Sequence, residues 1–207
     1  MIWTGFDLLK KYVEQGVADQ KLIPEDRKKL LKKLALRIHK NLVKEKYAEV
    51  IFICTHNSRR SHMSHLWAQL AAYYFGIKGV RCFSGGTEAT AINPRAVQAL
   101  VNAGMIITEL EGGSNPVYGV SFPGMADEIK VFSKRYSDPP NPVKDFHAVM
   151  TCSDADEACP VVEGALSRHA IKYEDPKKYD GTGEESVRYA EHSQQIAREM
   201  LYLFSCV

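Results

Sequence analysis

Five residues separate Cys54 from Arg60, and Ser61 follows directly. A cysteine thiolate is a strong nucleophile, and the planar guanidinium of an arginine matches two oxygens of a tetrahedral oxyanion. The hydroxyl of Ser61 can donate a hydrogen bond that stabilises the thiolate. These residue types at this spacing therefore indicate nucleophilic attack on a bound oxyanion.

The flanking elements explain how this stretch would bind an anion. Residues 50–53 are a short apolar run typical of a buried strand, and Ser61 opens a segment with helical spacing of apolar residues. The loop between them points several backbone N–H groups at one spot, which suits phosphate-like anions. Asn57 tolerates the left-handed backbone that such a cradle needs. The predicted oxyanion-binding loop comprises Thr55, His56, Asn57, Ser58, Arg59 and Arg60.

The stretch Cys-Thr-His-Asn-Ser-Arg-Arg-Ser resembles the anion loop of the low-molecular-weight protein tyrosine phosphatase family, which includes the thioredoxin-coupled arsenate reductases. The resemblance runs from about Tyr47 to the C-terminus and is broken by an insertion near residues 111–145. It departs from the family at His56, where glycine is usual. The alternative is a structural Cys54 beside a surface basic pair, because this spacing also arises by chance.

Strands alternate with helices along the rest of the chain. This alternation predicts right-handed βαβ units in an α/β fold. We expect an open four- to five-stranded, mainly parallel sheet with helices on both faces, like the low-molecular-weight phosphatases, and anion binding at the carboxyl ends of its strands. The strands are expected at residues 50–53, 80–84, 105–108, 146–151 and 171–173, helices at 93–103 and 186–204, and turns of the insertion at Pro123-Gly124 and Asp138-Pro-Pro.

Residues 1–46 form a predicted helical extension outside the resemblance, with residues 47–207 as the α/β domain. The extension carries 12 Lys and Arg against 6 Asp and Glu, but no aromatic interleaving or known motif points to nucleic acid. We expect one helix at residues 5–16 and another from Pro24 to about Lys46. The second has an apolar stripe that must be buried, either on the main domain or in a homodimer. The stripe comprises Leu30, Leu34, Ile38 and Leu42.

Two further cysteines follow the fourth predicted strand. Cys152 follows that strand as Cys54 follows the first, so both are expected at the same edge of the sheet. Cys159 lies seven residues later, a separation that a short flexible helix or loop can close into a disulfide. A zinc site is the structural alternative, although the spacing matches no usual zinc pattern. It would combine the two thiols with His56, His62 or His65.

Residues 151–160 resemble the redox segment of the arsenate reductases. The resemblance implies that Cys54 attacks arsenate, that Cys152 attacks the sulfur of Cys54, and that Cys159 resolves the resulting disulfide. A thioredoxin-type dithiol protein would then reduce the Cys152–Cys159 pair. Asp175, in an Asp-Pro pair, matches the general acid of the family. No metal is assigned, because His65 stands where those reductases carry an acid that helps to hold potassium.

Composition bounds these alternatives. The 207 residues are 45% hydrophobic and 25% charged, as in soluble globular proteins, with no apolar run of membrane-spanning length and no signal-peptide pattern. Five cysteines, three of them at positions that suit chemistry, indicate a cytoplasmic protein with reduced thiols. An arsenate reductase is favoured. The alternatives are a phosphatase that hydrolyses phosphomonoesters through a phospho-cysteine, and a non-catalytic oxyanion or redox sensor. Lys177-Lys178 stand where tyrosine phosphatases have aromatic residues, which disfavours phosphotyrosine.

Overall fold

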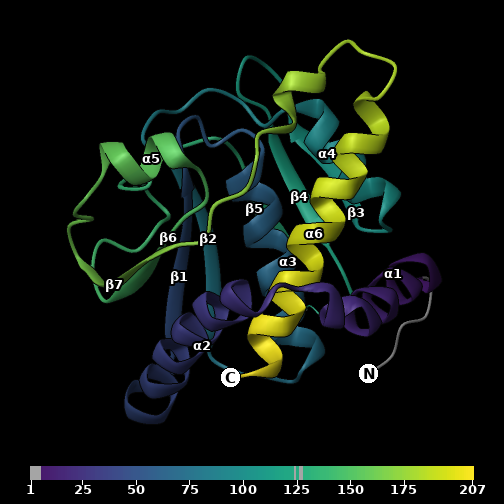
Figure 1. Ribbon diagram of the computed structural model, residues 1–207. Helices are drawn as coiled ribbons and strands as arrows, with labels where there is room; N and C mark the ends of the chain where they lie inside the picture. Colours follow the sequence, from purple (N-terminus) through teal and green to yellow (C-terminus); the bar gives the residue numbers. More distant parts are fainter. Residues whose placement is uncertain (1–5, 124, 126–127) are drawn as a thin grey trace.

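The computed structural model describes residues 6–123, 125 and 128–207 (Figure 1). At its centre lies a four-stranded sheet with the strand order β2-β1-β6-β7, in which all neighbouring strands are parallel. This is the α/β architecture that the alternation of strands and helices predicts. The strands are β1 (Ala48–Cys54), β2 (Val80–Gly86), β6 (Phe146–Met150) and β7 (Ala165–Ala170).

The side chains of β1 alternate between two apolar cores. Val50 and Phe52 face the larger core, which α2, α3 and α6 cover, whereas Ile51 and Ile53 face a smaller core beside α5. Every residue of β1 is buried, as expected for a central parallel strand. Helices therefore lie on both faces of the sheet, as predicted. They are α3 (Arg60–Tyr74), α4 (Pro94–Asn102), α5 (Ser153–Ala158) and α6 (Glu185–Ser205), with a 3-10 turn η2 (Pro176–Tyr179) before α6.

The N-terminal residues form α1 (Asp7–Ala18), the 3-10 turn η1 (Asp19–Leu22) and α2 (Glu25–Glu45). In Figure 1, α2 crosses the lower part of the sheet beside α6. Leu34 and Ile38 are buried there, as predicted, but Leu30 is 39% exposed and Leu31 takes its buried place. Residue 5, the expected start of the first helix, lies outside the described residues. The apolar stripe is thus covered by the chain's own sheet and C-terminal helix.

Two of the predicted strands differ in the structure. Residues 105–108 do not join the parallel sheet, because β3 (Ile106–Glu111) pairs antiparallel with β4 (Val117–Ser121), which in turn pairs with β5 (Ile129–Val131). The physical reason is that β3 has mostly exposed residues and carries Glu109 and Glu111, whereas an interior parallel strand must be apolar on both faces. The small second sheet therefore begins before the expected insertion.

The predicted strand at residues 171–173 is also wrong, because the edge strand is β7, which precedes it. Residues of β7 are mostly half-buried, so its sequence carries little apolar signal. The backbone N–H groups of Ile171 and Tyr173 still donate to the carbonyls of Met150 and Thr151, so the chain keeps running beside the end of β6. The turn at Asp138-Pro-Pro is present, closed by Asn141 N–H on the Asp138 carbonyl, whereas Gly124 of the other expected turn lies outside the described residues.

Candidate active site

The Cys54 loop connects the end of β1 to the start of α3. Cys54 is 3% exposed, and its Sγ lies 3.1 Å from Ser61 Oγ. Ser61 Oγ also accepts a hydrogen bond of 2.8 Å from Asn57 Nδ2. Because Asn57 occupies a lone pair of that oxygen, the Ser61 hydroxyl proton is available to Cys54 Sγ. The contact therefore suits stabilisation of a thiolate.

Asn57 fixes the shape of the loop from the inside. Its φ of 45° is left-handed, as predicted, and its Oδ1 accepts the backbone N–H of Lys134 at 2.9 Å. His62 Nε2 lies 2.9 Å from the Asn57 carbonyl, and His62 Nδ1 lies 3.1 Å from Ser84 Oγ. Burial and the charge of Lys134 lower the pKa of His62 well below its ordinary value. A neutral His62 that donates from Nε2 and accepts at Nδ1 satisfies both contacts.

Arg60 connects the loop to a segment more than a hundred residues later. It is buried, its Nη1 donates to the Tyr173 carbonyl at 3.3 Å, and its Nη2 donates to Asp175 Oδ2 at 2.7 Å. Asp175 Oδ1 accepts the backbone N–H of Lys177 at 3.0 Å, which orients the carboxylate. Arg60 Nε is buried and has no hydrogen-bond partner within the described residues. The guanidinium therefore retains a donor for a ligand.

Cys152 lies directly beside the same loop. It is fully buried, its Sγ lies 3.5 Å from Thr55 Oγ1, and it accepts the backbone N–H of Ala155 at 3.4 Å. This closeness follows from the sheet, because β1 and β6 are neighbours in register and the Thr151 N–H donates to the Ile53 carbonyl. Both thiols thus emerge at one edge, as the sequence predicts.

Cys159 lies at the other end of α5, half-buried against the smaller core. Seven helical steps of 1.5 Å separate its Cα from that of Cys152 by roughly 10 Å, whereas a disulfide needs about 4.4–6.8 Å. All five cysteines are free thiols. A Cys152–Cys159 disulfide therefore requires α5 to unwind.

The side chains of the remaining loop residues point in different directions. Arg59 turns its side chain away from the loop, with Nε 2.7 Å from Tyr189 Oη and Nη2 3.0 Å from Asp180 Oδ2. Only its backbone can therefore serve an anion. His56 is half-exposed at the mouth, and the Ser58 carbonyl accepts the N–H of Asn93.

Several supporting residues escaped the sequence analysis. The Arg59 side chain is hydrogen-bonded to Asp180, which precedes α6, and to Tyr189 on α6. Gly86 lets β2 approach the loop so closely that a Cβ at this position would clash with Thr55 O and Asn57 N. The Gly85-Gly86 pair at the end of a predicted strand is the signal that indicates such an approach. The Asp180 contact spans 121 residues and has no local signal.

The zinc alternative finds no support in this arrangement. Within residues 6–123, 125 and 128–207, no group of three or more His, Cys, Asp or Glu side chains lies together as a metal site. Both ring nitrogens of His62 are already hydrogen-bonded, Nε2 to the Asn57 carbonyl and Nδ1 to Ser84 Oγ.

An open pocket of about 850 Å³ adjoins Arg60 and Asp175. Its wall mixes lysines, acids and Ser153, and the ring of Tyr173 lies under the guanidinium of Arg27 at 4.7 Å. Among the residues that the structure describes, no other aromatic side chain lines the pocket. The pocket therefore suits a small charged ligand better than a phenyl ring.

Comparisons with known proteins agree with this geometry. The family model described as "Low molecular weight phosphotyrosine protein phosphatase" matches residues 49–112. An arsenate reductase of Oceanobacillus iheyensis is 30% identical over 140 residues, which cover 66% of this chain and 79% of that protein. The chain belongs to the low molecular weight phosphotyrosine protein phosphatase family.

A further relative and a solved structure are similar to this chain over a larger share of its length. An arsenate reductase of Bacillus licheniformis is 28% identical over 157 residues, covering 75% of this chain and 94% of that protein. A crystal structure of a YwlE mutant from Bacillus subtilis has the same fold, with a TM-score of 0.50 and 14% identity over 76% of this chain and 97% of that one. The family model spans the Cys54 loop, whereas Cys152, Cys159 and Asp175 lie beyond its match. The roles assigned to these three residues are therefore argued from their positions in this structure and not from the family model.

Among the described residues, no helix combines the length and the apolar character that crossing a membrane requires.

Proposed function

We propose that this family member is an arsenate reductase. The observation that carries the proposal is the position of Cys152, a buried thiol whose Sγ contacts Thr55 of the oxyanion loop. A second thiol, Cys159, lies at the far end of one short helix. A phosphatase has no use for this pair, whereas a reductase needs both to carry electrons.

The first step is nucleophilic attack. Backbone N–H groups of residues 55–60 and the guanidinium of Arg60 hold arsenate, and the Cys54 thiolate attacks its arsenic atom. The As–O bond to one oxygen breaks, and Asp175 supplies the proton with which that oxygen leaves as water. An arsenic(V) adduct on Cys54 Sγ results. Binding of the oxyanion competes with Asp175 for Arg60, so the substrate itself frees the carboxylate, which takes up a proton from the substrate or solvent before it donates it to the leaving oxygen.

The second step is reduction. The Cys152 thiolate attacks Cys54 Sγ, and the S–As bond breaks with its electron pair going to arsenic. Arsenic(V) becomes arsenic(III) and leaves as arsenite, while a Cys54–Cys152 disulfide forms. Cys159 then attacks Cys152, which releases the Cys54 thiolate and leaves a Cys152–Cys159 disulfide. An external dithiol supplies two electrons to reopen it.

The external partner, the compartment and the division of the chain belong to the same proposal. We assign the reductant as a thioredoxin-type protein and the compartment as the cytoplasm, where free thiols persist. We keep residues 1–46 as an extension and residues 47–207 as the catalytic domain, with an insertion near 111–145. A homodimer through the N-terminal helices would use the exposed Leu36 and Val43 of α2.

The second candidate is hydrolysis of phosphomonoesters. Cys54, Arg60 and Asp175 serve it equally well, and the family model itself describes phosphatases. Water, activated by Asp175, would then release phosphate from a phospho-cysteine. Against a phosphotyrosine substrate stands the pocket wall, where Lys177 and Lys178 follow Asp175-Pro176. A non-catalytic sensor would turn over neither substrate.

A parallel assay of wild-type protein tests the proposal. One arm follows arsenate-dependent oxidation of thioredoxin coupled to thioredoxin reductase and NADPH, and the other follows hydrolysis of para-nitrophenyl phosphate. We expect steady arsenate-dependent turnover that Cys152→Ser abolishes, while hydrolysis survives that change. Hydrolysis without any arsenate-dependent oxidation would establish the phosphatase, and neither activity would favour the sensor.

A further inference from the structure

Helix α5 is the link between the two redox thiols, and it is too short to be stable alone. It contains six residues, Ser153–Ala158. An isolated helix of this length is marginal in water, and its last carbonyl groups have no partner within the helix. Something outside the helix must therefore stabilise it.

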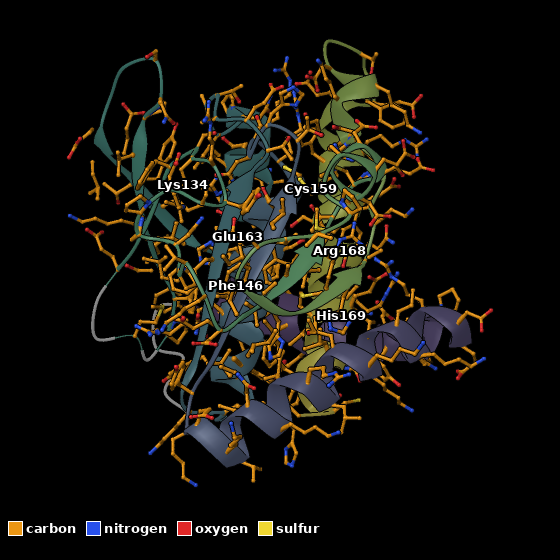
Figure 2. The ribbon with its side chains drawn as sticks, turned by 90° about the vertical axis from the view of Figure 1, so that its left-hand side faces the viewer. Lys134, Phe146, Cys159, Glu163, Arg168 and His169 are labelled. Carbon is orange, nitrogen blue, oxygen red and sulfur yellow. The ribbon has the colours of Figure 1, made fainter. Side chains whose placement is uncertain are left out.

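Arg168 supplies that stabilisation. Its Nε donates to the Cys159 carbonyl at 2.9 Å, and its Nη2 donates to the Asp156 carbonyl at 2.6 Å and also to the Asp156 carboxylate. One guanidinium thus satisfies two carbonyl groups at the C-terminal end of α5, where a positive charge is also favoured by the helix dipole. Figure 2 shows Arg168 next to Cys159.

The other end of this contact is fixed. Arg168 lies within β7, paired with Ala148 of β6, so its backbone is anchored to the parallel sheet. Lys172 Nζ adds a second cation 3.3 Å from Asp156 Oδ2. Burial raises the pKa of Asp156, but hydrogen bonds from Arg168 and Lys172 outweigh it and hold that pKa below its ordinary value. The carboxylate is therefore charged at neutral pH.

Formation of the Cys152–Cys159 disulfide opposes these contacts. The two Cα atoms must come several ångströms closer than a helix allows, so α5 must unwind. Unwinding would carry the Asp156 and Cys159 carbonyls away from the strand that bears Arg168. The bonds of Arg168 to these carbonyls are those of the free-thiol form, and closure of the disulfide would oppose them.

We propose that Arg168, through Asp156, is a positioning residue that holds α5 helical and so opposes closure of the Cys152–Cys159 disulfide. The proposal rests on the reductase function. In the resolving step, Cys159 thiolate attacks Cys152 Sγ, the Cys54–Cys152 bond breaks, and Cys54 leaves as a thiolate, so no net electrons are needed. Arg168 sets how far this exchange goes, and it makes the closed pair easier for a dithiol partner to reduce.

Redox equilibrium of the full-length protein tests the proposal. Wild type and variants are equilibrated in dithiothreitol buffers of graded potential, and the Cys152–Cys159 disulfide is quantified by alkylation and peptide mass spectrometry. Arg168→Gln removes the charge, and Asp156→Asn keeps the shape of the side chain. Arg188→Gln is the matched control, because that arginine pairs with Glu184 and Glu191 and lies over the Tyr179 ring, away from α5. Urea unfolding of each reduced protein is measured in parallel.

We expect Arg168→Gln to shift the equilibrium about tenfold toward the disulfide, which is a potential about 30 mV more negative. Asp156→Asn should shift it in the same direction, by less, and Arg188→Gln should leave it within about twofold. A merely structural Arg168 would lower the urea midpoint without moving the potential. That result, or an unchanged potential in both Arg168→Gln and Asp156→Asn, would overturn the proposal, and Asp156→Asn alone decides if Arg168→Gln does not fold. A wild-type protein that never forms this disulfide would instead refute the reductase function.

Discussion

Arg60 Nη2 lies 2.7 Å from Asp175 Oδ2, although 115 residues separate them in the chain. This ion pair joins the base of the oxyanion loop to the segment before α6, and only 10% of the Arg60 side chain is exposed. An incoming oxyanion must take over the guanidinium donors, which releases the carboxyl group beside the reacting oxygen. The contact between Arg60 and Asp175 thereby couples the loop that binds the anion to the acid.

The first prediction concerns Asp175. Asp175→Asn should lower kcat for arsenate by about 100-fold, because an amide has no proton to give to the departing oxygen. Alkylation of Cys54 should remain protectable by arsenate, since the loop itself is intact. Glu174→Gln is the control, because that neighbouring acid forms its ion pair with exposed Lys178 rather than with Arg60. Equal kcat for Asp175→Asn and the control would exclude Asp175 as the acid.

The second prediction concerns Cys54. Cys54→Ser should abolish both arsenate reduction and phosphoester hydrolysis, because a serine hydroxyl is not ionised in this loop near neutral pH. In the wild type, iodoacetamide should label Cys54, and inorganic phosphate should slow that labelling. Peptide mass spectrometry distinguishes it from exposed Cys206, whose labelling phosphate should not change. An unchanged rate of Cys54 labelling in the presence of phosphate would show that the loop does not bind the anion.

The third prediction concerns the N-terminal extension. Ile38→Ala should lower the free energy of unfolding by about 3 kcal/mol, because the side chain is fully buried and its loss leaves a cavity. Lys40→Ala, two residues away on the same helix but exposed, should change it by less than about 0.5 kcal/mol. Urea denaturation measures both. Similar small losses would mean that α2 does not pack on the sheet in solution.

The fourth prediction concerns acid stability. Burial first, and then the charge of Lys134, lower the pKa of His65 from 6.5 in the unfolded chain to about 3. Between those values the unfolded chain binds more protons, so stability falls as the pH falls. His65 alone should cost roughly 2 kcal/mol between pH 7.5 and pH 5.

Urea midpoints at the two pH values test this effect. His65→Gln should reduce the difference in the free energy of unfolding between the two pH values by about that amount. His56→Gln should not, because the His56 side chain is 48% exposed. An undiminished pH dependence in His65→Gln would contradict a buried neutral His65.

The site was predictable where its signals are local. The apolar run before Cys54, the small polar loop and the helical spacing after Ser61 lie within a few residues of one another, and the structure places β1, the loop and α3 there. The strand of residues 105–108 was assigned to the wrong sheet, because an isolated strand pattern does not specify its partner. Contacts such as Arg59 with Asp180 were invisible, since they depend on how α6 packs.

The apolar stripe on α2 also shows how far burial can be predicted from spacing alone. Spacing of four placed Leu30 in the buried set, yet Leu31 is buried instead. Each step of four residues goes about 40° beyond one full turn of the helix, so a long stripe drifts around the helix and its ends are least certain. Leu34 and Ile38, at its middle, are both buried.

Turnover by Cys159→Ser tests the central claim most directly. Cys54, Arg60 and Asp175 serve a reductase and a phosphatase alike, and only the reductase must pass electrons through Cys152 to Cys159. With thioredoxin as the sole reductant, Cys159→Ser should release at most one arsenite per molecule and accumulate a Cys54–Cys152 disulfide, detected by non-reducing peptide mass spectrometry. Repeated arsenite release by Cys159→Ser under the same conditions would contradict the account.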